Sequence, residues 1–306
     1  MAAPSAPFAI PDLPDPIAWA IPVFFIAMLA EMLWARARSP ESYEPRDTLT
    51  SLLLGFGSGL AGLLSAGVVT VIAFWAYDHR IATIPFVWWA WIACFVIDDF
   101  RYFLYHWLSH RSRLWWASHV NHHSSQHYNL STALRQTWTG FLVGNFLFQL
   151  PLFLLGFHPV MVAFCWGLNL IYQFWIHTEA VGRMPRWFEA VMNTPSHHRV
   201  HHATNPRYLD RNYAGVFIVW DRLFRTFEPE AEEERPHYGI VKQLGSFNLI
   251  WNVFHEWVGI ARDVWSAPWG AKLSYIFRAP GWSHNASRDT SDAIRARWAS
   301  EQGNAG

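Results

Sequence analysis

The sequence predicts an all-α integral membrane protein, with about four to five transmembrane helices and a helical, histidine-rich cap on the cytoplasmic side. Three observations support this prediction. Of the 306 residues, 52% are hydrophobic and only 15% are charged, whereas a soluble domain carries about 25% charged residues. Several apolar stretches are long enough to cross a bilayer, and histidines gather just beyond their ends. The net charge is zero, so no basic surface for nucleic acid is expected.

Five apolar stretches are candidates for membrane spans, because a spanning helix needs about 20 mostly apolar residues. Cys94 and Cys165 lie inside two of them, and we expect both to be small apolar packing residues. The last two stretches are separated only by the turn at residues 156–159, which predicts a hairpin that either crosses or re-enters the membrane. The five candidates are residues 16–35, 49–77, 84–105, 137–157 and 158–176.

The two ends of the chain differ from this apolar body. Residues 1–15 are rich in proline and carry no basic residue, so we expect a disordered lead-in and not a signal peptide. Residues 16–230 form the predicted catalytic domain. Residues 231–285 form an interfacial region whose helix near residues 250–265 either lies on the membrane surface or faces an ordinary core. Residues 286–306 are a polar tail that we expect to fray.

Basic residues predict the orientation, because arginine and lysine are retained on the cytoplasmic side. Five spans with the N-terminus outside satisfy the pattern and place the histidine-rich segments in the cytoplasm. The arginines that follow alternate stretches are Arg36, Arg38 and Arg46 after the first, Arg101, Arg111, Arg113 and Arg135 after the third, and Arg183, Arg186 and Arg199 after the fifth.

Histidines at helical spacing are the candidate metal-binding residues of the chain. Residues three and four apart share one face of a helix, so each group can aim its imidazoles at one point. His177 and His197 are further candidates, because the first ends the fifth apolar stretch and the second lies four before His201. His127 is ambiguous, and five others are expected to be structural: His79, His158, His237, His255 and His284. The spaced groups are His106 and His110, then His119, His122 and His123, then His198, His201 and His202.

So many imidazoles predict two metal ions, because a single tetrahedral ion takes three or four ligands. Imidazole suits iron, zinc, copper or nickel. Asp99 lies two helical turns before His106 and close to the predicted membrane, which makes it a functional candidate. It could orient His106 through the second ring nitrogen or bind metal itself. The alternative is an ion pair with Arg101.

Other interpretations of these motifs remain open or are disfavoured. His106 and His110 have the spacing of a zinc-protease helix but lack the glutamate of H-E-x-x-H, so a zinc hydrolase is one rival. A metal transporter is another, although transport sites lie at mid-membrane. The G-x-G-x-x-G sequence at residues 57–62 lies within an apolar stretch and lacks the strand that a dinucleotide site needs. The chain therefore needs an external electron donor for redox chemistry.

The three histidine groups together resemble the boxes of the membrane fatty acid hydroxylase / sterol desaturase superfamily. They read H-x3-H at residue 106, H-x2-H-H at residue 119 and H-x2-H-H at residue 198. The flanking sequences NHHSSQHYNLSTALRQ, NTPSHHRVHHATNPRYLDRNYAG and VWDRLFRTFEPE resemble the branch that contains alkylglycerol monooxygenase and its bacterial relatives. One departure is Arg111, which stands where that branch has glutamate.

The resemblance implies an oxidoreductase with two non-heme iron ions that uses O2 to attack a C–H bond of a lipid. It implies iron ligation by His106, His110, His119, His122, His123, His198, His201 and His202. Hydroxylation, desaturation and monooxygenation of a fatty acyl, sterol or ether lipid are all compatible with it. The expected partners are the membrane, the lipid substrate and a separate reductant.

Overall fold

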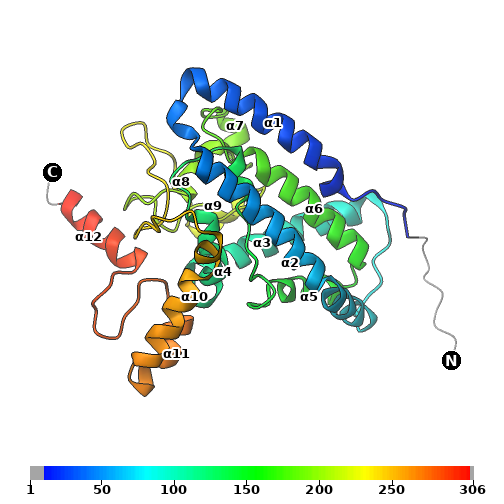
Figure 1. Ribbon diagram of the computed structural model, residues 1–306. Coiled ribbons are helices and arrows are strands. Elements are labelled where there is room, and N and C mark those ends of the chain that lie inside the picture. Colours follow the sequence, from blue (N-terminus) through cyan, green and yellow to red (C-terminus); the bar gives the residue numbers. More distant parts are fainter. Residues whose placement is uncertain (1–9, 304–306) are drawn as a thin grey trace.

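The computed structural model describes residues 10–303, which fold into helices with no β-strand beyond two isolated bridges. Figure 1 shows the long helices α1, α2, α3 and α6 grouped together, with α8 to α12 toward one end and the short α5 near the other. The elements are α1 Pro16–Arg38, η1 Pro40–Ser42, α2 Pro45–Asp78, α3 Trp88–Arg111, α4 Arg113–His123, η2 Leu130–Leu134, η3 Asn145–Gln149, α5 Leu150–Leu155, α6 Pro159–Trp175, α7 Arg186–Glu189, α8 Pro195–His201, α9 Val219–Phe224, α10 Leu249–Ser266, η4 Trp269–Ala271, α11 Lys272–Phe277 and α12 Ser291–Gly303.

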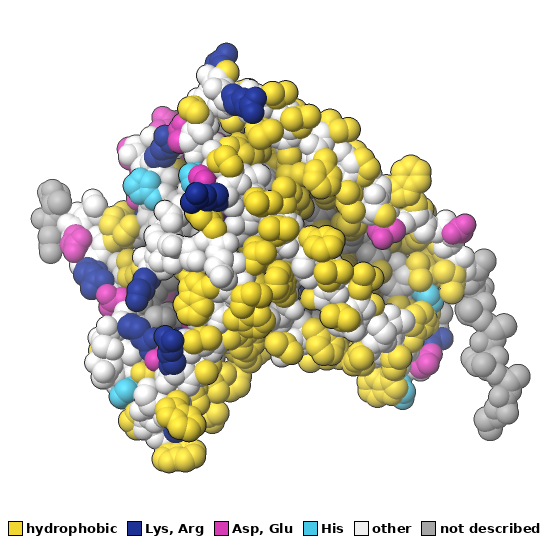
Figure 2. All heavy atoms as spheres, viewed as in Figure 1, with side chains coloured by type: hydrophobic (Ala, Val, Ile, Leu, Met, Phe, Trp, Pro, Cys, Tyr) yellow, Lys and Arg dark blue, Asp and Glu magenta, His cyan; other side chains and the backbone are white. Residues whose placement is uncertain are grey.

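Helices α1 and α2 are the two described helices that are long and apolar enough to cross a membrane. Asp15 begins α1 by accepting hydrogen bonds from backbone N–H groups of its first turn, and Glu44 does the same for α2. Their outward faces are hydrophobic, and Leu63 and Leu64 are 74% and 89% exposed. Figure 2 shows this hydrophobic surface running over both helices. The first two predicted spans are therefore confirmed as helices, each a few residues longer than expected.

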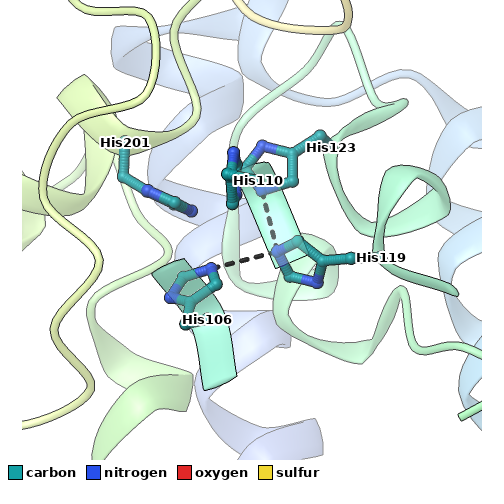
Figure 3. A group of neighbouring side chains, drawn as sticks. All are labelled: His106, His110, His119, His123 and His201. Atoms are coloured by element: carbon teal, nitrogen blue, oxygen red, sulfur yellow. Dashed lines mark hydrogen bonds between the residues drawn. The ribbon is translucent and has the colours of Figure 1, made fainter. Parts of the chain in front are cut away.

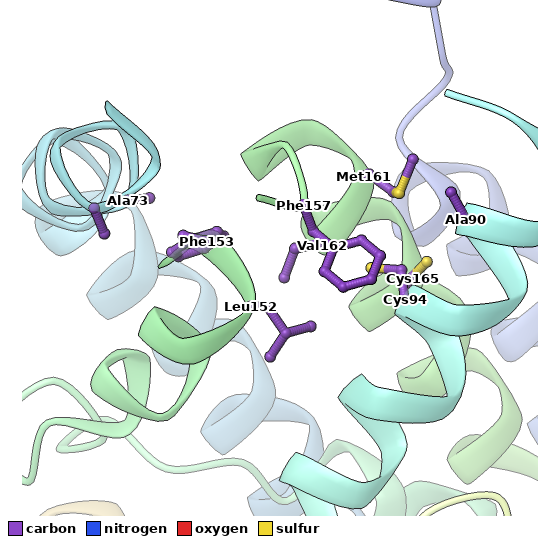
Figure 4. Close-up of a cluster of buried hydrophobic side chains, with 10 residues drawn as sticks. Ala73, Ala90, Cys94, Leu152, Phe153, Phe157, Met161, Val162 and Cys165 are labelled. Atoms are coloured by element: carbon purple, nitrogen blue, oxygen red, sulfur yellow. The ribbon is translucent and has the colours of Figure 1, made fainter. Parts of the chain in front are cut away.

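Helices α3 and α6 pack against each other inside this frame. Cys94 of α3 and Cys165 of α6 lie in one buried apolar cluster with Met161 and Phe157 (Figure 4). Both cysteines are free and buried, which confirms the expectation that they are packing residues. The predicted spans at residues 84–105 and 158–176 are thus helical, although α6 has only 17 residues.

The predicted fourth span, residues 137–157, is not a continuous helix, and this prediction was wrong. The chain turns irregularly through residues 137–144 and then forms only η3 and the six-residue α5. Gly144 adopts the left-handed conformation with φ of 69°, which a regular helix excludes. Gly156, with φ of 113°, then makes the predicted hairpin turn before α6.

The two ends of the chain were predicted unequally well. Most of the expected lead-in lies outside the described residues, and α1 starts at Pro16 as expected. The part of the predicted polar tail from Ser291 to Gly303 forms helix α12, and residues 304–306 lie outside the described residues. Arg111 holds this helix through two hydrogen bonds to the Asp292 carboxylate, at 2.9 and 2.7 Å. A sequence without apolar periodicity thus forms a helix because ion pairs fix it to the rest of the protein.

Candidate metal centre

Nine histidines meet in two buried clusters where α3, α4, α6 and α8 end. Within each cluster the potential ligand atoms all lie within 4.8 Å of one another. Figure 3 shows the rings of one cluster, His106, His110, His119, His123 and His201, pointing toward one another. Among residues 10–303, neither cluster includes a carboxylate or a thiol. Cluster A comprises His106, His110, His119, His123 and His201, and cluster B comprises His122, His177, His198 and His202.

The structure divides each three-histidine group between the two clusters, so the expectation that one group aims at one point was wrong. In α4, His119 and His123 join cluster A while His122 joins cluster B. Histidines four residues apart stay together because they differ by about 40° around the helix, whereas His122 and His123 diverge by about 100°. At α8 the same rule places His198 and His202 in cluster B and His201 in cluster A.

Backbone carbonyls fix the orientation of several rings. His106 Nδ1 donates to the Tyr213 carbonyl at 2.7 Å, and His201 Nδ1 donates to the Arg211 carbonyl at 2.9 Å. In cluster B, His177 Nδ1 donates to the Gln173 carbonyl at 2.7 Å, and His122 Nδ1 donates to the Arg135 carbonyl at 3.2 Å. Since a carbonyl only accepts, Nδ1 carries the proton in each ring. Nε2 is then left with a free lone pair that faces the cluster, as in metal-binding histidines.

These lone pairs lie too close together for an arrangement without a cation. His122 Nε2 and His177 Nε2 are 3.3 Å apart, and neither neutral ring has a proton to place between them. His198 Nε2 lies 3.0 Å from His177 Nε2. Nitrogen atoms bound to one ion by bonds of about 2.1 Å lie roughly 3.0–3.5 Å apart. His201 Nε2 and His110 Nε2 are buried without a hydrogen-bond partner. The donor set therefore fits metal ions.

Burial favours the neutral imidazole, which is the form that binds metal, at six of these histidines: His119, His122, His123, His198, His201 and His202. Loss of hydration on burial is the main cause that lowers the pKa of His122 to about 4. The same cause, together with neighbouring imidazoles, holds the pKa values of His119, His123, His198, His201 and His202 well below the usual value. Protons therefore compete weakly for the clusters at neutral pH.

Asp99 does not form the expected hydrogen bond with His106. Its buried carboxylate instead accepts from the backbone N–H groups of Val216 and Phe217 and from Trp220 Nε1, at 2.8, 3.0 and 2.9 Å. The alternative ion pair is not formed either, because Arg101 pairs with Asp98 at 2.7 Å. Asp99 therefore fixes the segment that follows Tyr213 and acts on His106 only through this backbone.

Asp221 holds the same segment from its other side, and sequence reasoning did not assign it this role. Its carboxylate accepts from the backbone N–H groups of Tyr213 and Ala214, each at 2.8 Å, and from Thr226 Oγ1 at 2.6 Å. Asp210 is a second residue that was missed, and it accepts from His110 Nδ1 at 3.3 Å. Neither aspartate lies three or four residues from a clustered histidine in the sequence. Their contacts with cluster A and with the segment that orients it form only when the loop folds.

A buried arginine supports cluster B. Arg135 is 1% exposed and pairs with Asp47 of α2 at 3.1 Å. Its guanidinium also donates to Asn252 Oδ1 of α10 at 3.0 Å. Because the Arg135 carbonyl accepts from His122, this hub joins α2 and α10 to one ring of cluster B.

His197 lies outside both clusters, although its spacing made it a candidate. Its Nε2 is 3.9 Å from the Glu189 carboxylate, and its ring packs edge-on against Phe227. Burial lowers the pKa of His197 to about 4, against the raising effect of Glu189. His177, which belongs to none of the three boxes, lies in cluster B. His127 bonds to the Glu41 carbonyl at 2.8 Å and is outside both clusters, as are the five histidines expected to be structural.

Comparisons with known proteins agree with this geometry. Residues 91–226, which contain both clusters, match the family described as "Fatty acid hydroxylase". The alkylglycerol monooxygenase of Homo sapiens is 38% identical over 285 residues, which cover 90% of this chain and 62% of that protein. The Xenopus tropicalis alkylglycerol monooxygenase is 37% identical, with 91% and 62% covered. A cholesterol 25-hydroxylase-like protein of Danio rerio is 30% identical over 153 residues, with 46% and 57% covered.

These matches confirm the resemblance that the three boxes predicted. The chain spans about three fifths of the length of the alkylglycerol monooxygenases that it matches. No solved structure matches the chain.

Proposed function

The segment from residue 91 to residue 226 belongs to the fatty acid hydroxylase family, and from this premise we propose that the protein is a membrane-bound iron oxygenase that uses O2 to oxidise a C–H bond of a lipid. The observation that carries the proposal is the pair of clusters in which nine imidazoles meet. An unactivated C–H bond has no acidic proton, so a general base alone cannot break it. Redox-active metal ions supply that chemistry when bound.

We assign one iron ion to each cluster. Cluster A offers five imidazoles and cluster B offers four, which matches the number of ligands that two ions need and exceeds what one ion can take. The surrounding residues position the rings before metal arrives: the loop at Tyr213 orients His106, and α6 orients His177. These histidines bind the ions, and their burial excludes bulk water from the site.

Electrons for the reaction come from a separate reductant in this proposal. The described chain is helical, and residues 57–62, which match the dinucleotide motif by spacing, lie inside the continuous helix α2. A nucleotide-binding turn between strand and helix is therefore absent from the described residues. The external donor is an electron-transfer protein or a small reductant.

We place the clusters at the cytoplasmic face of the membrane. The connection between α1 and α2 contacts the histidine-bearing elements: Asn129 Nδ2 donates to the Ser42 carbonyl at 2.6 Å, and Ser125 Oγ donates to Asp47 at 2.5 Å. The clusters thus lie at the same end of α1 and α2 as Arg36, Arg38 and Arg46. Basic residues of this kind favour the cytoplasmic side.

An alkylglycerol or a related ether lipid is the first substrate to test, because the relatives with the highest identity given above are named alkylglycerol monooxygenases. Arg111, the departure from that branch, pairs with Asp292 at 2.7 Å and lies 3.9 Å from Asp210, the carboxylate that accepts from His110. The difference therefore changes none of the proposed metal ligands, although it lies next to an outer contact of cluster A. Fatty acyl and sterol substrates belong in the same assay.

The test compares two histidine variants of the purified protein reconstituted with iron. The unmodified chain is expected to consume O2 when lipid and reductant are supplied. His177→Ala is expected to abolish lipid oxidation, whereas His127→Ala retains it, because His127 follows His123 by four residues but lies outside both clusters. Lipid products are identified by mass spectrometry.

Two outcomes would replace the proposal with a rival. Hydrolysis of lipid or peptide by the zinc-loaded protein without O2 would identify a zinc hydrolase. Uptake of metal ions into vesicles, with no lipid product under any condition, would identify a transporter. Equal rates of lipid oxidation by His177→Ala and by the unmodified chain would show that cluster B is not needed for the reaction.

A further inference from the structure

Helix α10 exposes large apolar side chains on one face. Ile250, Phe254, Ala261 and Trp265 share this face by helical spacing and are all exposed. Of these, Ile250 is 60% exposed and Trp265 is 89% exposed. This face continues into η4 and α11, where Trp269 is 88% exposed and Leu273 is 69% exposed. Trp265 and Trp269 are the most exposed tryptophans among residues 10–303.

The face of α10 that packs against the protein carries both polar residues and the buried Val253 and Ile260. Glu256 and Asp263 both pair with Arg113 of α4, each at 2.5 Å. These pairs neutralise the two carboxylates of α10 inside the protein. Asn252 is fully buried and accepts from Arg135 and from Ser124. Helix α10 thus combines the two alternatives that the sequence left open, because some of its apolar residues face the core and others face outward.

Three cations lie close to this apolar face. Arg262 and Arg278 are exposed, whereas Lys272 is half-buried and its Nζ donates to the Val264 carbonyl at 2.7 Å. None of the three has a carboxylate partner among the described residues. The Lys272 ammonium lies 4.8 Å from the centre of the Trp269 ring, and the Arg278 guanidinium lies 5.2 Å from that of Trp282. Tryptophan beside lysine or arginine is typical of the boundary between lipid headgroups and acyl chains.

The position of this hairpin agrees with that boundary. Figure 1 shows α10 and α11 projecting from the histidine-bearing end, with α10 steeply inclined to α1 and α2. Figure 2 shows hydrophobic side chains at the tip of this projection, whereas charged side chains gather over the part that carries α12. A helix inclined in this way to spanning helices lies along the membrane plane.

We propose that the hairpin of α10, η4 and α11 is an interfacial membrane anchor that inserts Trp265, Trp269 and Leu273 among lipid headgroups, while Arg262, Lys272 and Arg278 bind phosphate groups of anionic phospholipids. The anchor fixes the depth of Arg113 and of α4, which carries His119, His122 and His123. This inference does not depend on metal binding or on the reaction.

The experiment measures the depth of a fluorescent label in the full-length protein. Cys94 and Cys165 are buried, so the unmodified chain serves as the labelling blank. A polarity-sensitive thiol dye is attached to Leu273→Cys, and as a matched control to Ala299→Cys on the exposed side of α12. Both proteins are placed as single copies in nanodiscs of phosphatidylcholine, with or without phosphatidylglycerol.

The proposal predicts that lipids carrying a quencher near the headgroup quench the dye at residue 273 and leave the dye at residue 299 unaffected. Aqueous iodide is expected to quench residue 273 severalfold less than residue 299. Replacing Arg262, Lys272 and Arg278 together by glutamine is expected to remove any deepening caused by phosphatidylglycerol.

Equal iodide quenching at the two positions would overturn the proposal. Protection that appears only when two copies share a nanodisc would also overturn it, because the apolar face would then be a contact between copies of the chain. Circular dichroism of each variant checks that the helices remain folded.

Discussion

The two histidine clusters differ in what holds their rings. Cluster A depends on a loop: its rings at His106 and His201 bond to carbonyls of residues 213 and 211, and Asp99 and Asp221 fix the segment that follows. Cluster B depends on regular elements and a buried ion pair, because its rings bond to α6 and to the Arg135 carbonyl. All four rings of cluster B are buried, whereas His119 of cluster A is partly exposed.

This difference shows that one buried site can contain a fully buried cluster and a cluster with a partly exposed ring. In cluster B, His177 bonds to a carbonyl of α6 four residues earlier, and the carbonyl that accepts from His122 belongs to Arg135, whose guanidinium is held by Asp47 and Asn252. In cluster A, His106 and His110 bond to residues 107 and 100 positions later in the chain, and His119 is partly exposed. We therefore expect cluster A to exchange its metal faster, and each of the following changes tests that asymmetry.

The largest effect is expected from removing one ring of each cluster in turn. His201→Ala and His177→Ala should each abolish lipid oxidation and each weaken the binding of one metal ion, because the ligands fall from five to four in cluster A and from four to three in cluster B. A competing chelator should therefore remove the cluster A ion first from the first variant and the cluster B ion first from the second. Metal analysis together with the activity assay measures both effects, and full activity in either variant would contradict the assignment.

A smaller loss is expected when the buried ion pair beneath cluster B is broken. Arg135→Met keeps the volume of the side chain but leaves Asp47 buried without its partner, which costs about 3–5 kcal/mol of folding stability. The unfolding midpoint in detergent should fall, and cluster B should lose metal before cluster A.

The matched control is Arg183→Met, because Arg183 pairs with Glu232 on the surface. That change should cost no more than about 1 kcal/mol. Equal destabilisation by the two variants would show that the hub of Arg135 does not support the fold.

An intermediate effect is expected at the loop of cluster A. Asp221→Asn places an amide against the backbone N–H of Tyr213 or Ala214, so one hydrogen bond is lost and the carbonyl that orients His106 shifts. Loss of such an outer contact weakens metal affinity by about 10- to 100-fold. Titration with a competing chelator should detect this in cluster A alone. Asp289→Asn, on the exposed surface, is the control, and an unchanged affinity in both variants would refute the role of Asp221.

The smallest effect is expected at Arg111. Arg111→Met removes a partly exposed pair with Asp292, which contributes about 0–1 kcal/mol. We expect α12 to become more sensitive to proteolysis, while metal content stays unchanged. Loss of metal from Arg111→Met would show that this departure from the alkylglycerol monooxygenase branch reaches the metal centre.

Much of the site could be predicted from helical spacing, and the limits of that prediction are instructive. Spacing identified eight of the nine clustered histidines, and position at the end of an apolar stretch identified His177. Spacing could not show that neighbours such as His122 and His123 belong to different clusters, because this depends on what faces each side of α4. It also included His197, whose ring turns to Glu189.

The fold was predicted where apolar length and helix formation coincide, as in α1 and α2. It was not predicted at residues 137–157, because apolar composition indicates burial but does not require one continuous helix. Gly144 breaks that segment. The roles of Asp210 and Asp221 were also missed, because the contacts of both carboxylates exist only after distant segments meet.

The central claim is that nine histidines form two separate metal sites. Elemental analysis of the purified, iron-reconstituted protein tests it most directly when the unmodified chain, His201→Ala, His177→Ala and His127→Ala are compared. After a wash with a competing chelator that leaves the unmodified chain loaded, the account predicts about two ions in the unmodified chain and in His127→Ala, and about one ion in each of the other two variants, whose affected cluster has lost one ligand. One ion in the unmodified chain, with none in either cluster variant, would contradict it and would indicate a single shared site.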